Sequence, residues 1–332
     1  MSASPASSEL ITGAEASRMA LDEAMTLDPS VLVFGEDVAD PEGGGNWGAT
    51  TGLSTKYGTR CRSTAISEQA IAGAAVGAAI AGMRPVAEIM LMNFIAVAMD
   101  QIVNHAAKIR FMSGGQTGVP LTIRTSSGAG RGLGGQHSDM LEAWFAHVPG
   151  LKVVVPRNQA DWKGLLLSCI LDDDPCIFVE NTLLMRTKGP APSPGYRLEL
   201  GKATVLKPGT DVTVVGYGRP MNDALALANE LEAQSLSVEV IDLRTIVPMD
   251  EVTVFESVAK TGRAVVVHEA VKKFGVGAEI SARIHEELFS SLKAPVQRVG
   301  AKYAPVPFAK HLEDACIWSK ASIEAAVRKA LS

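Results

Sequence analysis

The sequence contains few cysteines and few aromatic residues for its length. Its 332 residues include four cysteines, and Phe, Trp and Tyr together make up 5% of the chain. Four cysteines are too few for a secreted disulfide framework, and no CxxC pair is present that could hold a metal ion. A reducing, cytoplasmic location is therefore expected.

The chain also lacks a strong excess of one charge and a long hydrophobic segment. Its 31 basic and 36 acidic residues give a net charge of −5 with both signs interspersed, so nucleic acid is not an expected partner. The longest weakly charged stretch, Ala70–Met83, is interrupted by glycines and is shorter than the ~20 apolar residues of a membrane-spanning helix. No membrane segment is expected. The start, MSASPASS, has no signal-peptide core and is typical of a flexible tail.

What is present is a regular alternation of strand-like apolar runs and helix-length segments. This pattern is typical of parallel sheets covered by helices on both faces, so the expected fold class is α/β. In the first part, strands are expected at Val31–Gly35, Pro85–Ile89, Pro120–Thr125, Leu151–Pro156 and Cys176–Glu180. Helices are expected at Gly13–Leu27, Glu68–Gly82, Phe94–Met112 and Asn158–Leu171.

A segment rich in proline and glycine, TKGPAPSPGY, interrupts the alternation and predicts an extended connector. We therefore expect a flexible tail at 1–12, a first α/β domain at 13–186, a linker at 187–200 and a second, smaller α/β domain at 201–332. In the second domain, strands are expected at Asp211–Tyr217, Ser237–Leu243, Ala264–His268 and Pro295–Val299. Helices are expected near Met221–Ala233 and Gly277–Phe289.

A glycine-rich segment, Gly130–Gly135, satisfies the GxGxxG pattern of dinucleotide-binding loops. However, no acidic residue ends a second strand about 20 residues later, and the motif lies in the middle of a domain. A loop that delivers His137 to a cleft is the better interpretation, because loops on a rigid sheet commonly present reactive groups. Dinucleotide binding remains the alternative hypothesis.

Two further polar residues stand in apolar surroundings. Glu68 lies between Ile66 and a run of small residues, so we expect it to be partly desolvated; the alternative is a carboxylate that only stabilises a helix start capped by Ser67. His268 lies where a parallel strand is expected to end, and local packing is the favoured interpretation. The absence of HExxH, P-loop, GxSxG and zinc-spaced motifs argues against the common hydrolases and kinases.

Several segments together resemble one known family. They are FGED at 34–37, TAISEQAIAGAAVGAAIAGMRPVAEI at 64–89, DQIVNHAAKIRFMSGG at 100–115, GGQHSDMLEAWFAHVPGLKVVVP at 134–156 and GLLLSCILDDDPCIFVEN at 164–181. The similarity continues through DVTVVGYGRP, VEVIDLRTIVPMD, FGVGAEI and APVQRVG, and so extends from about Glu15 to the C-terminus. The chain resembles the β subunits of thiamine-diphosphate-dependent 2-oxo acid dehydrogenases.

This resemblance implies a pyrimidine-binding domain followed by a transketolase-type C-terminal domain, with thiamine diphosphate as the cofactor. Glu68 matches the glutamate that hydrogen-bonds the aminopyrimidine ring and stabilises the tautomer that removes the thiazolium proton. Phe94 matches the aromatic residue stacked on the pyrimidine, Met90 matches a neighbouring pocket wall, and Ile66 is expected in the same pocket. His137 matches the histidine that assists acyl transfer to a lipoyl arm.

The resemblance also implies partners and metal ions. The GDG…N motif that binds magnesium and diphosphate in this superfamily is absent, so an α subunit is expected to supply it in a heterotetramer of two α and two β chains. A lipoylated acyltransferase is a further expected partner. Some members hold a potassium ion in a site whose ligands are all oxygen atoms, which suits a hard cation. The alternative is that these residues form an ordinary loop without an ion. The matching residues are Val119, Leu121, Cys169 and Asp172 through their carbonyls, with Thr122 and Asp174 nearby.

Departures from the family pattern leave the substrate open. TAISE replaces the usual TPISE, HSDM replaces HSQS or HSQC, and the loop Asp40–Trp47 has an unfamiliar composition. The expected function is decarboxylation of a 2-oxo acid, pyruvate first, with transfer of the acyl group to a lipoyl acceptor. Branched-chain 2-oxo acids, acetoin and acyloin formation by a carboligase remain alternatives, as does a purely architectural role.

Overall fold

The computed structural model describes residues 9–332 and divides into two compact units. Unit 1 contains the residues up to Ser127 together with Trp144–Leu200, and unit 2 contains Gly128–Ala143 together with Gly201–Ser332. The glycine-rich loop, expected within the first domain, is thus part of unit 2. Of the predicted tail at 1–12, residues 1–8 lie outside the described part, and Leu10–Ile11 forms a strand, β1.

Unit 1 is built on a parallel sheet with strand order β6-β7-β5-β4-β2-β3. Its strands are β2 (Val31–Glu36), β3 (Cys61–Thr64), β4 (Arg84–Leu91), β5 (Thr122–Ser127), β6 (Lys152–Val154) and β7 (Cys176–Asn181). Every residue of β5 and β7 is buried, as expected for central strands covered on both faces.

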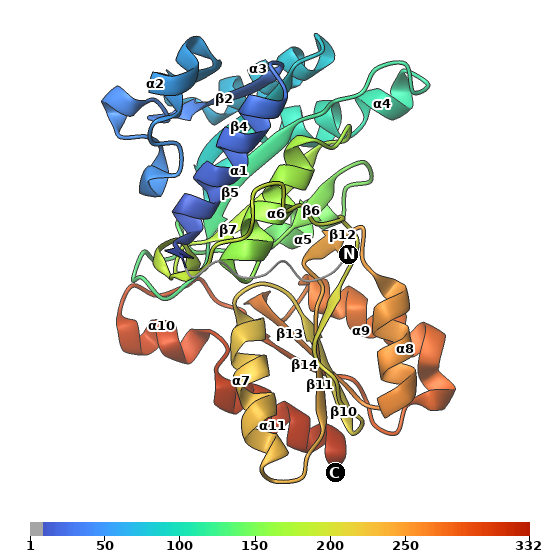
Figure 1. Ribbon diagram of the computed structural model, residues 1–332. Helices are drawn as coiled ribbons and strands as arrows, with labels where there is room; N and C mark the ends of the chain where they lie inside the picture. The colour runs from blue at the N-terminus through green and yellow to red at the C-terminus, as the bar shows by residue number, and fades with distance from the viewer. Residues whose placement is uncertain (1–8) are drawn as a thin grey trace. The chain divides into compact units, whose positions relative to one another are not determined.

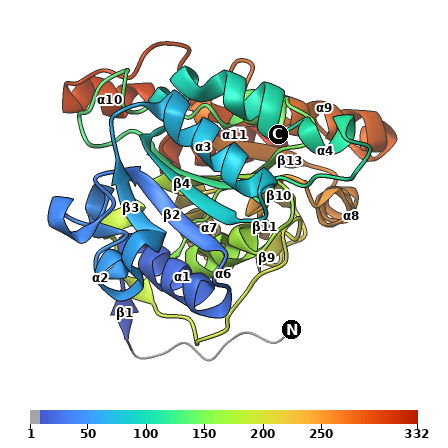
Figure 2. The same cartoon turned by 90° about the horizontal axis from the view of Figure 1, so that it is seen from above.

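Helices cover both faces of this sheet, and Figure 2 shows β4 and β2 between α3 on one side and α1 on the other. The helices of unit 1 and of its junction with the loop are α1 (Gly13–Leu27), α2 (Leu53–Tyr57), α3 (Glu68–Ile80), α4 (Ile109–Met112), α5 (Glu142–Ala146) and α6 (Gln159–Ile170). A capping box between Thr12 and Glu15 starts α1, which packs along α6. The expected positions of α1, α3 and α6 are therefore confirmed to within two residues at each end.

The helix predicted at Phe94–Met112 is wrong as a single element. The chain there forms a 3₁₀ helix, η4 (Met92–Ala98), then a π-helix, η5 (Gln101–Ala106), and then the short α4. Apolar periodicity cannot distinguish these hydrogen-bonding patterns, and both η4 and η5 pack against α3. Other single 3₁₀ turns lie at Asp40–Glu42, Asn46–Gly48, Gly58–Arg60, Leu184–Arg186 and Phe289–Ser291.

Unit 2 has a sheet of order β14-β13-β10-β11-β9, in which only the edge strand β9 runs antiparallel to its neighbour. Its strands are β9 (Thr204–Lys207), β10 (Val212–Gly216), β11 (Val238–Asp242), β13 (Ala264–Val271) and β14 (Gln297–Ala301), with a short β12 (Thr245–Val247). In Figure 1, α7 and α11 lie together on one side of this sheet and α8 and α9 on the other. The helices are α7 (Pro220–Glu232), α8 (Glu251–Thr261), α9 (Val276–Leu288), α10 (Lys310–Cys316) and α11 (Lys320–Leu331).

The predicted linker contains no α-helix. Its residues Gly189–Pro190 form β8, which pairs antiparallel with β1. No helix within residues 9–332 is both long enough and apolar enough to cross a bilayer.

Candidate active site

Glu68 is the first residue of α3, and Ser67 caps that helix by accepting a hydrogen bond from the Ala70 amide at 3.4 Å. Its side chain is half-buried, as the sequence predicts. Glu36, at the end of β2, is an electrostatic neighbour. Burial raises the pKa of Glu36, and the charges of Asp37 and Glu68 raise it further. The Glu36 and Glu68 carboxylates therefore lie near one another at this edge of the sheet, and this favours the binding of a proton or of a hydrogen-bond donor there.

The other predicted pocket residues lie on adjacent elements. Met90 is near the end of β4 and is half-buried; its carbonyl oxygen accepts a hydrogen bond of 2.6 Å from Ser126 Oγ. Phe94 is half-buried in η4, which packs on α3. Ile66 is 74% exposed in the turn before α3. A single exposed apolar side chain is ordinary on a protein surface, so the exposure of Ile66 alone does not indicate a binding site.

The predicted loop with His137 lies in unit 2, and no helix begins within Gly128–Gly135. The amides of Gly130 and Gly132 donate to Glu313 Oε1 at 2.7 and 3.2 Å. A dinucleotide site would need these amides, and a helix start behind them, to hold a diphosphate. Because a carboxylate of the same chain binds the amides, the structure does not favour the dinucleotide hypothesis. His137 follows the loop and is half-buried.

Three charged side chains are buried together in the sheet of unit 1. Arg124 on β5 donates from Nε to Glu180 Oε1 at 2.9 Å and from Nη1 to Glu88 Oε2 at 2.7 Å. Each of the three is at most 3% exposed. Ser17 on α1 donates to Glu180 Oε1 at 2.7 Å and accepts from Trp162 Nε1 on α6 at 2.7 Å. Buried charges are tolerated only when they are paired, as these three are. Through Ser17 and Trp162 the network also joins the sheet to α1 and α6.

The Glu88 carboxylate also holds the loop that follows β2. Its Oε1 accepts a hydrogen bond of 3.0 Å from the Asn46 amide. The preceding Gly44 and Gly45 have φ angles of +77° and +76°, which favour glycine. A Cβ at Gly45 would lie 3.1 Å from each Glu88 carboxylate oxygen, and a Cβ at Gly44 would lie 2.6 Å from Thr51 Cα. Both glycines are therefore needed for the loop to reach Glu88.

Unit 2 contains a second buried polar group, formed by Glu142, Tyr217 and His268. Tyr217 donates to Glu142 Oε1 at 2.6 Å, and its ring stacks on His268 with centroids 6.2 Å apart. Burial raises the pKa of Glu142 to about 7, although the Tyr217 hydrogen bond opposes the shift. Burial lowers the pKa of His268 to about 4, and the Arg298 charge lowers it further. His268 is fully buried, which supports the packing interpretation made from its strand position.

The Glu142→Gln variant is expected to make stability less dependent on pH. The folded-state pKa of Glu142 is raised from 4.5 to about 7. The contribution of neutral Glu142 to the free energy of unfolding is therefore fully present below pH 4.5 and is lost as the pH rises to about 7. At pH 8 the variant should therefore be more stable than the parent by up to about 3 kcal/mol, at roughly 1.4 kcal/mol per pKa unit, and by much less at pH 5. Thermal unfolding of the full chain at both pH values measures this difference. Equal differences at both pH values would contradict it; the exposed Glu256→Gln variant is the control.

Sequence patterns do not single out Glu88, Arg124, Glu180 or Glu142. The signal that could have found Glu88 and Glu180 is a charged residue within an apolar strand, as in VAEIML and CIFVEN. No such signal marks Arg124, because its strand, TIRTSS, is mostly polar. Nothing comparable marks Glu142, because its hydrogen-bond partner, Tyr217, lies 75 residues away in sequence.

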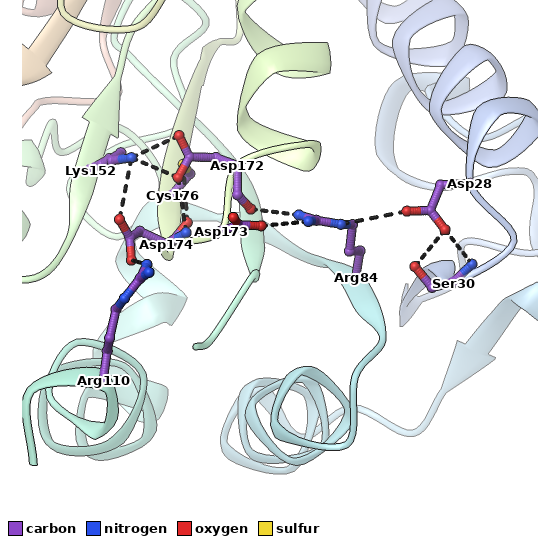
Figure 3. A network of polar contacts seen from close by, with 9 residues as sticks. All are labelled: Asp28, Ser30, Arg84, Arg110, Lys152, Asp172, Asp173, Asp174 and Cys176. Carbon is purple, nitrogen blue, oxygen red and sulfur yellow. Dashed lines mark hydrogen bonds and ion pairs between the residues drawn. The ribbon is translucent and has the colours of Figure 1, made fainter. Parts of the chain in front are cut away.

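The loop Asp172–Asp174, part of the predicted potassium site, is surrounded by cationic side chains (Figure 3). Lys152 Nζ lies 2.6 Å from Asp172 Oδ1, and Arg84 Nη1 donates to the Asp172 carbonyl at 2.8 Å. Arg84 also pairs with Asp173, and Arg110 pairs with Asp174. Burial opposes the charge on Lys152, but Asp172 raises the pKa of Lys152 overall. The carboxylates of this loop are thus neutralised by the chain itself.

The predicted carbonyl ligands are engaged in the backbone. The Val119 carbonyl accepts from the Leu121 amide at 2.8 Å, and the Leu121 carbonyl accepts from the Cys176 amide at 2.8 Å. The Cys169 carbonyl accepts from the Asp172 amide at 3.2 Å. Each carbonyl keeps a second lone pair. The Thr122 hydroxyl is buried and has no hydrogen-bond partner among the described residues. Within residues 9–332, no group of three His, Cys, Asp or Glu side chains could hold a metal ion.

Comparison with known proteins matches both halves of the chain. Residues 9–188 match the transketolase pyrimidine-binding domain, and residues 201–323 match the transketolase C-terminal domain. The chain is 44% identical to the acetoin:2,6-dichlorophenolindophenol oxidoreductase subunit beta of Cupriavidus necator, over 94% of this chain and 95% of that protein. It is also 44% identical to the pyruvate dehydrogenase E1 component subunit beta of Rhizobium meliloti, over 98% of this chain and 71% of that protein.

A third relative is the mitochondrial 2-oxoisovalerate dehydrogenase subunit beta of Chaetomium thermophilum, which is 49% identical over 87% of this chain and 62% of that protein. Among solved structures, an inactive β4 tetramer of a split-gene transketolase superposes with a TM-score of 0.79. It shares 25% sequence identity and covers 97% of this chain and 98% of that chain.

Proposed function

The chain belongs to the β subunits of the thiamine-diphosphate-dependent 2-oxo acid dehydrogenases, which work with an α subunit, and from this premise we propose the roles of its residues. We propose that it takes part in decarboxylation of a 2-oxo acid, pyruvate first, and in transfer of the acyl group to a lipoyl acceptor. The observation that carries the proposal is the 44% identity to a pyruvate dehydrogenase β subunit over 98% of this chain.

Glu68 is the residue we assign to cofactor activation. Thiamine diphosphate, when bound, supplies the acidic carbon and the electron sink for this chemistry. The half-buried Glu68 carboxylate would accept a hydrogen bond from the pyrimidine ring, and its partial desolvation strengthens that bond. Phe94, Met90 and Ile66 would supply the apolar walls. His137 would hold or release a proton during acyl transfer.

The proposed assembly is a heterotetramer of two α and two β chains, with a lipoylated acyltransferase as a further partner. Magnesium would be held mainly by the α subunit, because GDG…N is absent from this sequence. A potassium ion at the carbonyls of Val119, Leu121, Cys169 and Asp172, near Asp174, is supported by the Thr122 hydroxyl, which has no hydrogen-bond partner within residues 9–332. A cytoplasmic location is supported by the four cysteines, which are all buried free thiols.

Acetoin is the second candidate substrate. Acetoin:2,6-dichlorophenolindophenol oxidoreductase β subunits of Cupriavidus necator and Bacillus subtilis are 44% and 41% identical to this chain. The Glu68 and His137 assignments hold for either substrate, because cleavage of acetoin and decarboxylation of pyruvate require the same activated cofactor.

Co-purification with an α chain that contains GDG…N tests the proposed function. The β chain alone should show no turnover, whereas the complex with thiamine diphosphate and magnesium should reduce dichlorophenolindophenol in the presence of one of pyruvate, 2-oxoisovalerate or acetoin. The preferred substrate is the one with the highest kcat/KM. A stable complex that binds the cofactor but consumes none of the three would contradict the proposal.

A further inference from the structure

The carboxylate of Glu313 is buried against the glycine-rich loop of unit 2. Glu313 lies on α10 and is 0% exposed. Its Oε1 accepts hydrogen bonds from the amides of Gly130 at 2.7 Å and Gly132 at 3.2 Å, and its Oε2 lies 3.2 Å from the Gly132 amide. Hydrogen bonds to an ionised acceptor are roughly twice as strong as neutral ones. The Glu313 side chain therefore fixes the backbone of Gly130 and Gly132, which lie 183 and 181 residues away in sequence.

A second buried carboxylate holds the start of the same loop. Glu269, on β13 and 5% exposed, accepts from the Ala129 amide at 3.0 Å. Arg219 Nη2 lies 3.4 Å from both Glu269 Oε1 and the Ala129 carbonyl. Three amides within four consecutive residues are thus held by two carboxylates of unit 2.

The segment before α10 closes over the rest of the loop. A Cβ at Gly134 would lie 2.4 Å from the Phe308 ring, and a Cβ at Gly135 would lie 3.2 Å from Pro305. Gly134 has a φ of +74°, and its carbonyl accepts a hydrogen bond of 3.2 Å from the His137 amide. The shape of the loop is therefore set by residues 305–313 up to the point where His137 begins.

We propose that Glu313 is a positioning residue for His137: by holding the amides of Gly130 and Gly132, it fixes the loop from which the histidine acts in acyl transfer. This inference rests on the proposed role of His137. Glycines can adopt many backbone conformations, so without an anchor the loop would spread over several of them. The proposal gives α10 a function in the transfer step that acts through the backbone of Gly130 and Gly132.

The experiment uses the complex of the β chain with its α chain and compares two activities. Reduction of dichlorophenolindophenol requires no acyl transfer to a lipoyl group, whereas acylation of a free lipoylated domain does. The variants are Glu313→Gln, which keeps the shape and removes the charge, and Glu313→Asp, which keeps the charge. Asp314→Asn, an exposed acid on the same helix, is the matched control, and His137→Ala gives the effect of losing the histidine.

Glu313→Gln should lower lipoyl acylation about tenfold, which is the scale of a hydrogen bond to a charged group, and change dye reduction by less than about twofold. Hydrogen exchange at the amides of Gly130 and Gly132 should be faster in this variant, and Glu313→Asp should recover part of the acylation rate. The Asp314→Asn variant should match the parent in both assays.

Four outcomes distinguish failure of this inference from failure of the proposed function. An equal loss of both activities would make Glu313 a merely structural residue and would overturn the inference. Faster exchange with unchanged lipoyl acylation would also overturn it. If His137→Ala leaves acylation unchanged, or if the parent complex has no activity, the proposed function itself fails.

Discussion

Replacing Glu68 by glutamine is expected to lower kcat by about 10²–10⁴-fold, the usual contribution of a positioned acid or base. Glutamine keeps the length and the hydrogen-bonding capacity of the side chain but carries no charge to stabilise a protonated or imino pyrimidine ring. The measurement is dye reduction by the complex at saturating thiamine diphosphate, with calorimetric titration of the cofactor to separate binding from turnover.

Glu279→Gln is the matched control, because Glu279 also lies in the first turn of a helix, α9. A carboxylate that only stabilises a helix start contributes about 0.3–1 kcal/mol. If Glu68 has no other role, the two variants should show the same small change in melting temperature and full activity. That result would favour the architectural alternative, whereas loss of activity in Glu68→Gln alone would exclude it.

Replacing Arg124 by methionine is expected to destabilise the chain by about 3–5 kcal/mol, because Glu88 and Glu180 would remain buried without a cation. Arg124 makes three hydrogen bonds of 2.7–3.1 Å to these carboxylates. The midpoint of urea unfolding for the full chain measures the loss. The Asn46 loop should also exchange its amide hydrogens faster, since Glu88 would no longer be fixed.

Two comparison variants make this test specific. Arg110→Met removes an arginine that is 48% exposed and pairs with Asp174, so the expected loss of stability is small, because solvent screens an exposed ion pair. The triple variant Glu88→Leu, Arg124→Met, Glu180→Leu should recover most of the stability, because it leaves no unpaired buried charge. Equal midpoints for Arg124→Met and Arg110→Met would contradict the importance assigned to the buried network.

The fold could be predicted well where local sequence determines structure. The helix expected at Gly13–Leu27 has those bounds in the structure, since its capping box and its amphipathic pattern are local. The segment Phe94–Met112 could not be predicted, because the choice among α, 3₁₀ and π hydrogen bonding depends on contacts with α3. The position of Gly128–Ala143 in unit 2 likewise depends on contacts with residues more than 100 positions away.

The candidate site shows the same division. The partial burial of Glu68 follows from its apolar neighbours, and the position of His137 in a loop follows from the glycines before it. The partners of Arg124 lie 36 and 56 residues away, and those of Glu313 lie more than 180 residues away. Charge pairing over such separations is set by strand order and by packing, which composition and periodicity do not encode.

The glycines at positions 44 and 45 have a practical consequence for protein engineering. Attempts to change substrate range often randomise a loop of this kind, but a side chain at either glycine would meet Thr51 or Glu88. Mutant libraries should therefore leave both glycines unchanged and place their diversity at Asn46, because its hydrogen bond to Glu88 comes from the backbone.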